Sequence, residues 1–405
     1  MIDQFSIGDF FIDKNYWTKV KFGDVAFEPK ESAKDAVAEG IEHVVGLEHI
    51  DSEDIHLRRS ASIEKSTTFT KIFAKEDVLF GRRRAYLKKA AQAKFEGICS
   101  GDITVMRAKE ILIPALLPFI VNNEKFFDYA ITHSAGGLSP RVKFKDLANY
   151  EFLLPPKDQQ IELAELLWSC DSVVESDLSE KTHLSKTLDV EIESKIHGVD
   201  LTGNTIKQVI KKLSKKMNII TLKNMGEILK GKGIAKSEVI KNGIPCVRYG
   251  ELYTKHDRII REFYSFVSPD SAKKAINLKT NDILFAGSGE TITEIGKSAA
   301  FVGQEEVYAG SDILVFRPKN MDGTYLGYLM NSQLVRQQLN KFGTGATVMH
   351  VYGSDIEKIE VPERSLEEQV EIGFFLESIS RNIFLIEDKL LKAKLFQKSL
   401  INQVF

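Results

Sequence analysis

Residues 366–405 read LEEQVEIGFFLESISRNIFLIEDKLLKAKLFQKSLINQVF, with no proline and with Gly373 as the single glycine. Alternating steps of four and three residues select a stripe in which nine of ten positions are apolar: Ile372, Leu376, Ile379, Ile383, Ile386, Leu390, Ala393, Gln397, Leu400 and Val404. A 3.5-residue repeat of this length is typical of a coiled-coil seam, because it keeps one stripe facing a partner helix. The stretch therefore predicts a long helix packed along another helix. The simpler alternative is a helix that covers a single domain.

A second long helix is expected over Lys157–His197. It follows Pro155 and Pro156, and proline favours the start of a helix. Its apolar positions are less regular than those of the first stretch: Leu163, Leu167, Cys170, Val174, Leu178, Leu184, Leu188, Ile192 and Ile196. Asp177 and Lys181 occupy positions that are apolar in the other helix. The sequence therefore predicts this helix but leaves its packing register open.

Short matches recur in the same order at spacings of 203 to 210 residues along the chain. The matched pairs are Gly40-Ile41 with Gly243-Ile244, Asp77–Phe80 with Asp282–Phe285, Gly101–Arg107 with Ser311–Arg317, and Lys145–Leu147 with Ser354–Ile356. Their shared order predicts a duplicated unit, in which a domain of strands and helices is followed by a helix of roughly 40 residues, about 60 Å long. A duplicated helix also supplies the expected partner within the same chain.

The chain has 405 residues, which suggests two or three domains. Its cysteines, Cys99, Cys170 and Cys246, lie far apart, which argues against a disulfide framework and a zinc site and favours a reducing compartment. The first residues lack a signal-peptide pattern, and no apolar run reaches the roughly 20 residues that span a bilayer. We therefore expect a cytoplasmic protein.

The net charge of −2 is small, but charge is unevenly distributed. Residues 58–94 hold eleven Lys and Arg against three acidic residues, and residues 203–233 hold eight Lys against one Glu. Residues 157–197 hold ten acidic residues against four Lys. Basic segments suit a polyanion and an acidic helix suits a protein partner, although a solvated surface is the simpler reading of each run.

Two variable domains alternate with two long helices, and each helix opens after a proline- and glutamine-containing segment, LPPKDQQ at 154–160 and VPERSLEEQ at 361–369. This arrangement resembles the DNA specificity subunit of type I restriction–modification systems. The resemblance implies an α+β fold with two similar mixed α/β target recognition domains. It further implies two long antiparallel helices that form an internal coiled coil with pseudo-two-fold symmetry.

The resemblance also implies the role and partners of the chain. Each recognition domain would read one half of a split target in double-stranded DNA, and the helices would set the spacing and dock two methyltransferase subunits. Those subunits would methylate adenine with S-adenosylmethionine, and a nuclease-motor restriction subunit is a further partner. The chain itself would perform no chemistry.

On this basis five segments are expected. The first target recognition domain would span residues 1–154, and the first spacer helix residues 155–198. A linker at 199–217 would lead to the second recognition domain at 218–362. The second spacer helix would span 363–405.

The sequence contains no recognisable catalytic motif. Gly296-Lys297-Ser298 resembles the end of a P-loop, but Thr291 stands where that motif needs glycine. Pro155-Pro156 lacks the context of an adenine methyltransferase loop, and Asp270 with Lys273 is too isolated for a nuclease metal site. The sequence predicts no catalytic residue, metal or cofactor. A stand-alone methyltransferase or nuclease with an unrecognised site is the main alternative, and a coiled-coil scaffold is another.

The predicted DNA contacts of the first domain follow Gly81, at the end of the strand expected over Asp77–Phe80. They are Arg82, Arg83, Arg84, Lys88 and Lys89. Arginine can bind phosphates or the guanine edge, although a solvated strand end would look the same. The matching position of the second domain carries Ser288 within AGSG, and such a difference suits two different half-sites as well as simple loop variation.

Glycine-rich loops at 136–141 and 343–347 form a second matched pair of candidate contacts. Glycine allows close approach to a DNA backbone, but a plain turn is an equal alternative. The predicted residues here are Ser139, Arg141, Lys143, Thr344 and Thr347. Lys230, Lys232, Arg248 and Tyr249 complete the set, and the lysines would mainly add salt-dependent phosphate affinity.

Overall fold

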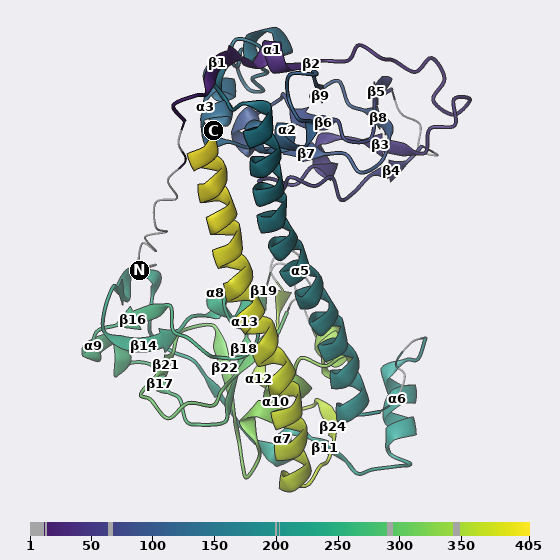
Figure 1. Ribbon diagram of the computed structural model, residues 1–405. Helices are drawn as coiled ribbons and strands as arrows, with labels where there is room; N and C mark the ends of the chain where they lie inside the picture. The colour runs from purple at the N-terminus through teal and green to yellow at the C-terminus, as the bar shows by residue number, and fades with distance from the viewer. Residues whose placement is uncertain are drawn as a thin grey trace. The chain divides into compact units, whose positions relative to one another are not determined.

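The computed structural model describes residues 12, 14–63, 68–198, 201, 203–289, 295–342 and 349–405. The chain divides into two compact units. Unit 1 comprises residues 1–179 and 388–405, and unit 2 comprises residues 180–387. Each unit contains one domain of strands and short helices together with a part of each of two long helices (Figure 1).

The two long helices are α5 (Lys157–Ile196) and α13 (Leu366–Val404). In unit 1 the first half of α5 packs on the last part of α13, where Lys389 Nζ donates to Asp177 Oδ1 at 2.7 Å. In unit 2 the last part of α5 packs on the first part of α13, where Lys181 and Glu387 form an ion pair at 2.8 Å. The helices are therefore antiparallel within each unit, and the predicted internal coiled coil is confirmed.

The seam predicted from the sequence is the stripe that α13 buries. All ten seam positions are buried or half-buried, and Leu376 and Val404 are fully enclosed. The seam of α5 also buries Asp171 and Asp177, which are 4% and 2% exposed. Gln397 of α13 donates to Asp171 at 2.9 Å, so both acidic residues meet a polar partner on α13. A shift of register would separate both acidic residues from these partners, so polar seam residues favour the observed register, which the sequence left open.

The strands of unit 1 are β1 (Thr18–Lys21), β2 (Ala26–Phe27), β3 (His43–Val45), β4 (Ala61–Ser62), β5 (Lys71–Phe73), β6 (Val78–Gly81), β7 (Ala90–Gln92), β8 (Gly97–Cys99), β9 (Ile103–Ala108) and β10 (Glu151–Leu154). They form a sheet of order β2-β9-β6-β7, a sheet of order β4-β3-β8-β5, and the antiparallel pair β1-β10. Strand β6 is buried at every position, as its unbroken apolar sequence predicts for an interior strand.

The short helices in the described part of unit 1 are α1 (Phe22–Val25), η1 (Leu47–His49), η2 (Ala85–Leu87), η3 (Pro114–Leu116), α2 (Leu117–Val121), α3 (Glu124–Thr132) and α4 (Phe144–Leu147). The core of this unit is rich in aromatic rings, and Phe126 contacts both Phe22 and Phe80. The last turn of α13 enters the same core through Ile401, and Phe405 follows it at the end of the sequence.

The strands of unit 2 are β11 (Ile219–Thr221), β12 (Gly226–Lys230), β13 (Val239–Ile240), β14 (Ile244–Val247), β15 (Arg258–Ile259), β16 (Ser265–Val267), β17 (Ile276–Asn277), β18 (Asp282–Ala286), β19 (Ser288–Gly289), β20 (Ser298–Phe301), β21 (Tyr308–Ala309), β22 (Ile313–Pro318), β23 (Met349–His350) and β24 (Glu360–Pro362). Two five-stranded sheets have the orders β12-β22-β18-β20-β15 and β13-β16-β14-β21-β17. Strands β11 and β24 form one further pair, and β19 and β23 form another.

The helices of unit 2 besides the long pair are α6 (Ile206–Leu213), α7 (Leu222–Met225), η4 (Lys236–Glu238), α8 (Tyr249–Thr254), α9 (Pro269–Ala272), α10 (Gly323–Leu329), α11 (Gln333–Phe342) and α12 (Gly353–Ile356). Helix α6 lies in the segment expected to link the two halves, and its Val209 packs in a small cluster with Leu334 of α11. Among the described residues, no helix is long and apolar enough to cross a membrane.

The two units repeat one topology. The antiparallel order β9-β6-β7 recurs as β22-β18-β20, and the parallel pair β3·β8 recurs as β14·β21. A bidentate ion pair is repeated as well, between Arg107 and Asp77 in unit 1 and between Arg317 and Asp282 in unit 2. The predicted mixed α/β duplication is therefore confirmed.

The glutamine of each Pro–Gln segment explains why the segment recurs. Gln160 is 1% exposed; its side chain accepts a hydrogen bond from the backbone of Ile113 and donates to the carbonyl of Pro155. Gln369 is 3% exposed and makes the matching bonds, from Asp322 and to Arg364. One amide thus satisfies buried backbone groups of both the domain and the start of its helix, which ties the two together.

Candidate nucleic-acid interface

The basic segment of unit 1 is held by backbone hydrogen bonds to two other loops. Arg82 follows the last residue of β6, and its backbone N–H donates to the carbonyl of Asp102 at 3.0 Å. Its own carbonyl accepts from Val142 at 3.0 Å, and the N–H of Arg84 donates to Pro140 at 2.8 Å. Residues 82–84 and the glycine-rich loop therefore form one continuous surface.

Asp102 orients two of the predicted arginines. Arg83 Nη1 donates to one carboxylate oxygen at 3.2 Å, and Arg141 Nε donates to the other at 2.8 Å. Burial raises the pKa of Asp102, but the bonds and charges of Arg141 and Arg83 outweigh it and hold this pKa below its ordinary value. Arg83 also donates to Ser139 Oγ at 3.1 Å. Three predicted residues thus share one network around a carboxylate that the sequence analysis did not single out.

The other predicted residues of unit 1 differ in availability. Arg84 is exposed and has a left-handed backbone with φ of 55°, a conformation that non-glycine residues adopt only when their surroundings hold them there. Lys88 lies 3.3 Å from the carboxylate of Glu124, and Lys89 donates to a backbone carbonyl at 2.7 Å. Lys143 is exposed at the start of α4. Arg84 and Lys143 are therefore the more accessible cations.

The glycine-rich loop of unit 1 also presents an apolar residue. The side chain of Leu138 is 97% exposed, and it lies between Gly136 and the arginine-bound Ser139. Tyr86 and Leu87, which follow the basic segment, are 52% and 41% exposed. Sequence reasoning missed this apolar component, and the signal that could have revealed it was a leucine placed directly after two glycines in a loop.

Unit 2 repeats the backbone arrangement with different side chains. The N–H of Gly287 donates to Asp312 at 2.8 Å, and the carbonyl of Gly287 accepts from Val351 at 3.1 Å. Ser288 pairs with His350 across β19 and β23, and Ser288 Oγ lies 3.3 Å from His350 Nδ1. His350 was not among the predicted residues. The predicted Thr344 and Thr347 lie outside the described residues.

The remaining predicted residues of unit 2 lie around the strands next to Asp312, the residue whose carbonyl accepts from Gly287. Arg248 and Tyr249 line a hollow of about 560 Å³ together with Asp312. Lys230 ends β12, and Lys232 follows Gly231, whose N–H donates to Ile313 beside that aspartate. The structure thus places Arg248 and Tyr249 beside Asp312, while Ser288 belongs to the β19–β23 pair.

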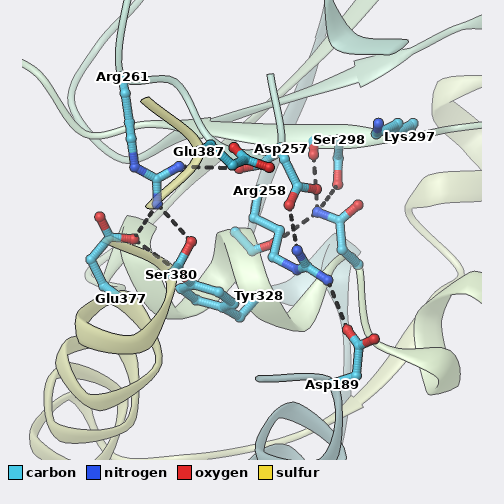
Figure 2. A network of polar contacts seen from close by, with 12 residues as sticks. Asp189, Asp257, Arg258, Arg261, Lys297, Ser298, Tyr328, Glu377, Ser380 and Glu387 are labelled. Carbon is cyan, nitrogen blue, oxygen red and sulfur yellow. Dashed lines mark hydrogen bonds and ion pairs between the residues drawn. The ribbon is translucent and has the colours of Figure 1, made fainter. Parts of the chain in front are cut away.

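Polar side chains attach the domain of unit 2 to its part of the long helices (Figure 2). Arg261 donates to Glu377 at 2.8 Å and to Ser380 at 2.9 Å, both on α13. Tyr328 of α10 donates to the same glutamate, and Arg258 donates to Asp189 of α5 at 3.2 Å. Unit 1 has comparable contacts to α5, since Arg58 donates to Glu175 at 3.0 Å and His56 lies 2.8 Å from Asp171. In each unit, polar contacts thereby attach the domain to its part of the long helices.

Comparison with known proteins identifies a domain of known class within this chain. Residues 214–395 match the family model described as the type I restriction modification DNA specificity domain. The chain therefore carries a domain of that class, and the resemblance inferred from its sequence is confirmed.

The chain is also similar to particular proteins. It is 24% identical over 303 residues to the type I restriction enzyme MjaVIII specificity subunit of Methanocaldococcus jannaschii, covering 71% of this chain and 68% of that protein. The fold resembles the S subunit of a type I restriction–modification system from M. genitalium, with a TM-score of 0.62, 14% identity and 98% coverage of both chains. A chain from a study of complex assembly and conformational transition of the type I R-M system gives 0.54 and 18% identity, covering 96% of this chain and 97% of that one.

Proposed function

We propose that this chain is the DNA specificity subunit of a type I restriction–modification complex, in which each domain reads one half of a split target. The observation that carries the proposal is the repetition of one loop framework with different side chains. Arg83 and Arg141 stand in unit 1 where Ser288 and His350 stand in unit 2. A duplicated domain that keeps its framework and varies these positions is what recognition of two unlike half-sites requires.

The chain contributes recognition, and methyl transfer and cleavage belong to other subunits of the complex. The family match is to a DNA specificity domain, and the curated relative is named a specificity subunit. The proposed contacts are also those of a DNA-binding subunit and not of a catalytic one, because exposed arginine and lysine side chains bind phosphates and base edges. Residues 1–154 and 218–362 are the proposed recognition domains. Segments 155–198 and 363–405 are the proposed spacer helices, and 199–217 the proposed linker.

The outward face of α13 is the proposed docking surface for methyltransferase subunits, with one subunit on each unit. Large apolar side chains are exposed along this helix although the seam faces the other way. In unit 2 they are Leu366, Val370, Phe374, Phe375, Phe384 and Leu385, and in unit 1 Leu391, Leu395 and Phe396. Exposed apolar surface of this extent marks a protein interface. A nuclease-motor restriction subunit is a further proposed partner.

The continuous helices α5 and α13 are proposed to set the spacing between the half-sites. Removing one heptad from each helix shortens it by about 10 Å, which corresponds to about three base pairs of duplex. Matched deletions in the two helices should therefore shift the spacer of the target and leave the bases of both halves unchanged. An unchanged spacer would mean that another element sets the separation.

Co-expression with a candidate methyltransferase, followed by genome-wide mapping of methylated adenine, tests the function. A split, asymmetric motif with a spacer of fixed length is expected. Incubation of the purified chain alone with DNA and labelled S-adenosylmethionine provides the opposing test. Methyl transfer without a partner would refute the proposal and favour a stand-alone methyltransferase.

A further inference from the structure

We propose that one cross-loop pair in each unit determines base specificity, Arg83 with Arg141 in unit 1 and Ser288 with His350 in unit 2. The inference rests on the proposed DNA-recognition function and assigns its readout to particular side chains. It also adds His350, which the sequence analysis did not identify.

The two pairs occupy equivalent backbone positions. Arg83 and Arg141 form an antiparallel bridge, and so do Ser288 and His350. In unit 1 Arg82, the residue before Arg83, donates its backbone N–H to the carbonyl of Asp102 and accepts from the N–H of Val142. In unit 2 Gly287, the residue before Ser288, makes the same two bonds with Asp312 and Val351. The framework around the pair is therefore the same in both units.

Bridge geometry places the two side chains of a pair on one face. Directly opposite residues of an antiparallel pair have Cβ atoms about 4.5–5.5 Å apart. The side chains of Arg83 and Arg141 are 38% and 45% exposed, and His350 is exposed while Ser288 is half-buried. Two adjacent, accessible polar side chains on a fixed backbone can reach the edges of one base pair or of two neighbouring pairs.

The framework that carries each pair is rigid. The bidentate bonds of Arg107 to Asp77 join β9 to the segment leading into β6, the strand that ends next to Arg82. Arg317 and Asp282 join β22 to β18 in the same way, and β18 leads to Ser288. Because the anchors are alike, the two surfaces differ in their side chains, and the pairs are the part of that difference that lies on the shared bridge.

The chemistry of the two pairs differs in charge and in hydrogen-bonding capacity. Two guanidinium groups present only donors, and the O6 and N7 atoms of guanine present two acceptors in the major groove. Asp102 binds one nitrogen of each guanidinium group, and Ser139 binds a second nitrogen of Arg83. Each Nη group carries two N–H bonds, so the Nη groups of both arginines retain a donor for DNA. A serine hydroxyl and an imidazole each combine donor and acceptor capacity, so they suit a base edge that presents both, such as adenine. We therefore assign a guanine-containing half-site to unit 1 and a different half-site to unit 2.

Exchange of the pairs tests the assignment in the methyltransferase-bound complex. The wild-type complex, the double variant Arg83→Ser/Arg141→His and the double variant Ser288→Arg/His350→Arg are each used to select duplexes from a randomised library. Lys75→Ser and Lys279→Ser are matched controls. These exposed lysines precede β6 and β18, so they lie at the strand ends that are far from Arg83 and Ser288. Arg141→Lys and His350→Asn serve as milder variants if a double variant fails to fold.

Each double variant should change the preferred bases in one half of the target and leave the other half and the spacer unchanged. Loss of an arginine contact to guanine should reduce discrimination by about 5- to 150-fold. Replacing guanine with 7-deazaguanine in the unit 1 half-site removes the N7 acceptor, which should weaken the wild-type complex and leave the Arg83→Ser/Arg141→His variant unaffected.

Two results would overturn the inference. One is an unchanged selected sequence in a variant that still binds, and the other is an equal loss of preference in both halves. The control variants should select the wild-type sequence, and a change of sequence in them would likewise count against a special role for the pairs. Failure of the proposed function looks different, because the wild-type complex would then select no sequence at all.

Discussion

Lys389→Met should destabilise the helix pair of unit 1 more than Asp177→Leu, although the two side chains form one ion pair. The asymmetry follows from burial, since the Asp177 side chain is 3% exposed and that of Lys389 is 63% exposed. Removal of the lysine leaves a buried carboxylate whose Oδ2 already has no hydrogen-bond partner among the described residues. Removal of the aspartate leaves an amine that reaches water and places an apolar residue in the seam.

The expected magnitudes follow from this geometry. An uncompensated buried charge costs about 3–5 kcal/mol, and we expect the lower end, about 3 kcal/mol, because water reaches the lysine side of the pair. For Asp177→Leu and for the double variant Asp177→Leu/Lys389→Met, the free energy of unfolding should be unchanged or higher by up to about 2 kcal/mol. Apolar replacement of a buried ion pair is often neutral or favourable.

Guanidinium-induced unfolding of the full chain, followed by helix circular dichroism, measures these differences. Lys392→Met is the matched control, because Lys392 pairs with Asp388 one turn away on α13 and both side chains are about half exposed. Its effect should stay below about 1 kcal/mol. If Lys389→Met were as stable as the wild type, Asp177 would have to be hydrated, and the explanation of register by buried polar residues would be wrong.

Three further results are expected. Asp102→Asn should raise non-specific DNA affinity and lower the ratio of specific to non-specific binding roughly tenfold, measured by fluorescence anisotropy, because Arg83 and Arg141 lose the carboxylate that orients them; an unchanged ratio would contradict this role. Phe374→Ser, at a position 77% exposed, should leave the unfolding midpoint unchanged and weaken methyltransferase docking about 10- to 100-fold by calorimetry. Burial, with a smaller effect of Lys297, lowers the pKa of His256 to about 4. Because the unfolded histidine binds a proton near pH 6.5, stability should fall by up to about 1.4 kcal/mol per pH unit between pH 6.5 and 4, and His256→Asn should flatten that slope in acid-dependent unfolding.

The helices and the repeat were predictable because both leave periodic or ordered traces in the sequence. The seam of α13 needed only its 3.5-residue spacing, and the duplication needed only matched patches such as those beginning at Asp77 and Asp282. The partners of Asp177 and Lys181 were not predictable, because they lie on a helix about 200 residues later in the chain. A charged residue at a seam position indicates that a polar partner is needed, but it does not indicate which residue supplies that partner.

The candidate recognition surface was predictable only in part, for a related physical reason. A run of three arginines is visible locally, but the carboxylate that orients one of them arrives from a loop about 20 residues away. His350 joins Ser288 through a pairing of two-residue strands, which is too short to produce an alternating pattern. Leu138 is an isolated apolar residue in a loop, and only its 97% exposure distinguishes it from a core residue.

The placement of Ile401 and Phe405 in the core of unit 1 has a consequence for biosynthesis. The domain that leaves the ribosome first is completed by residues translated after all of unit 2. About 210 residues separate the two segments of unit 1, which corresponds to roughly 10–40 s at 5–20 residues per second. During that interval the first domain exposes the surface that α13 later covers, so a chaperone that shields apolar surface should bind nascent chains ending before residue 388 and release chains in which residues 388–405 are free to fold.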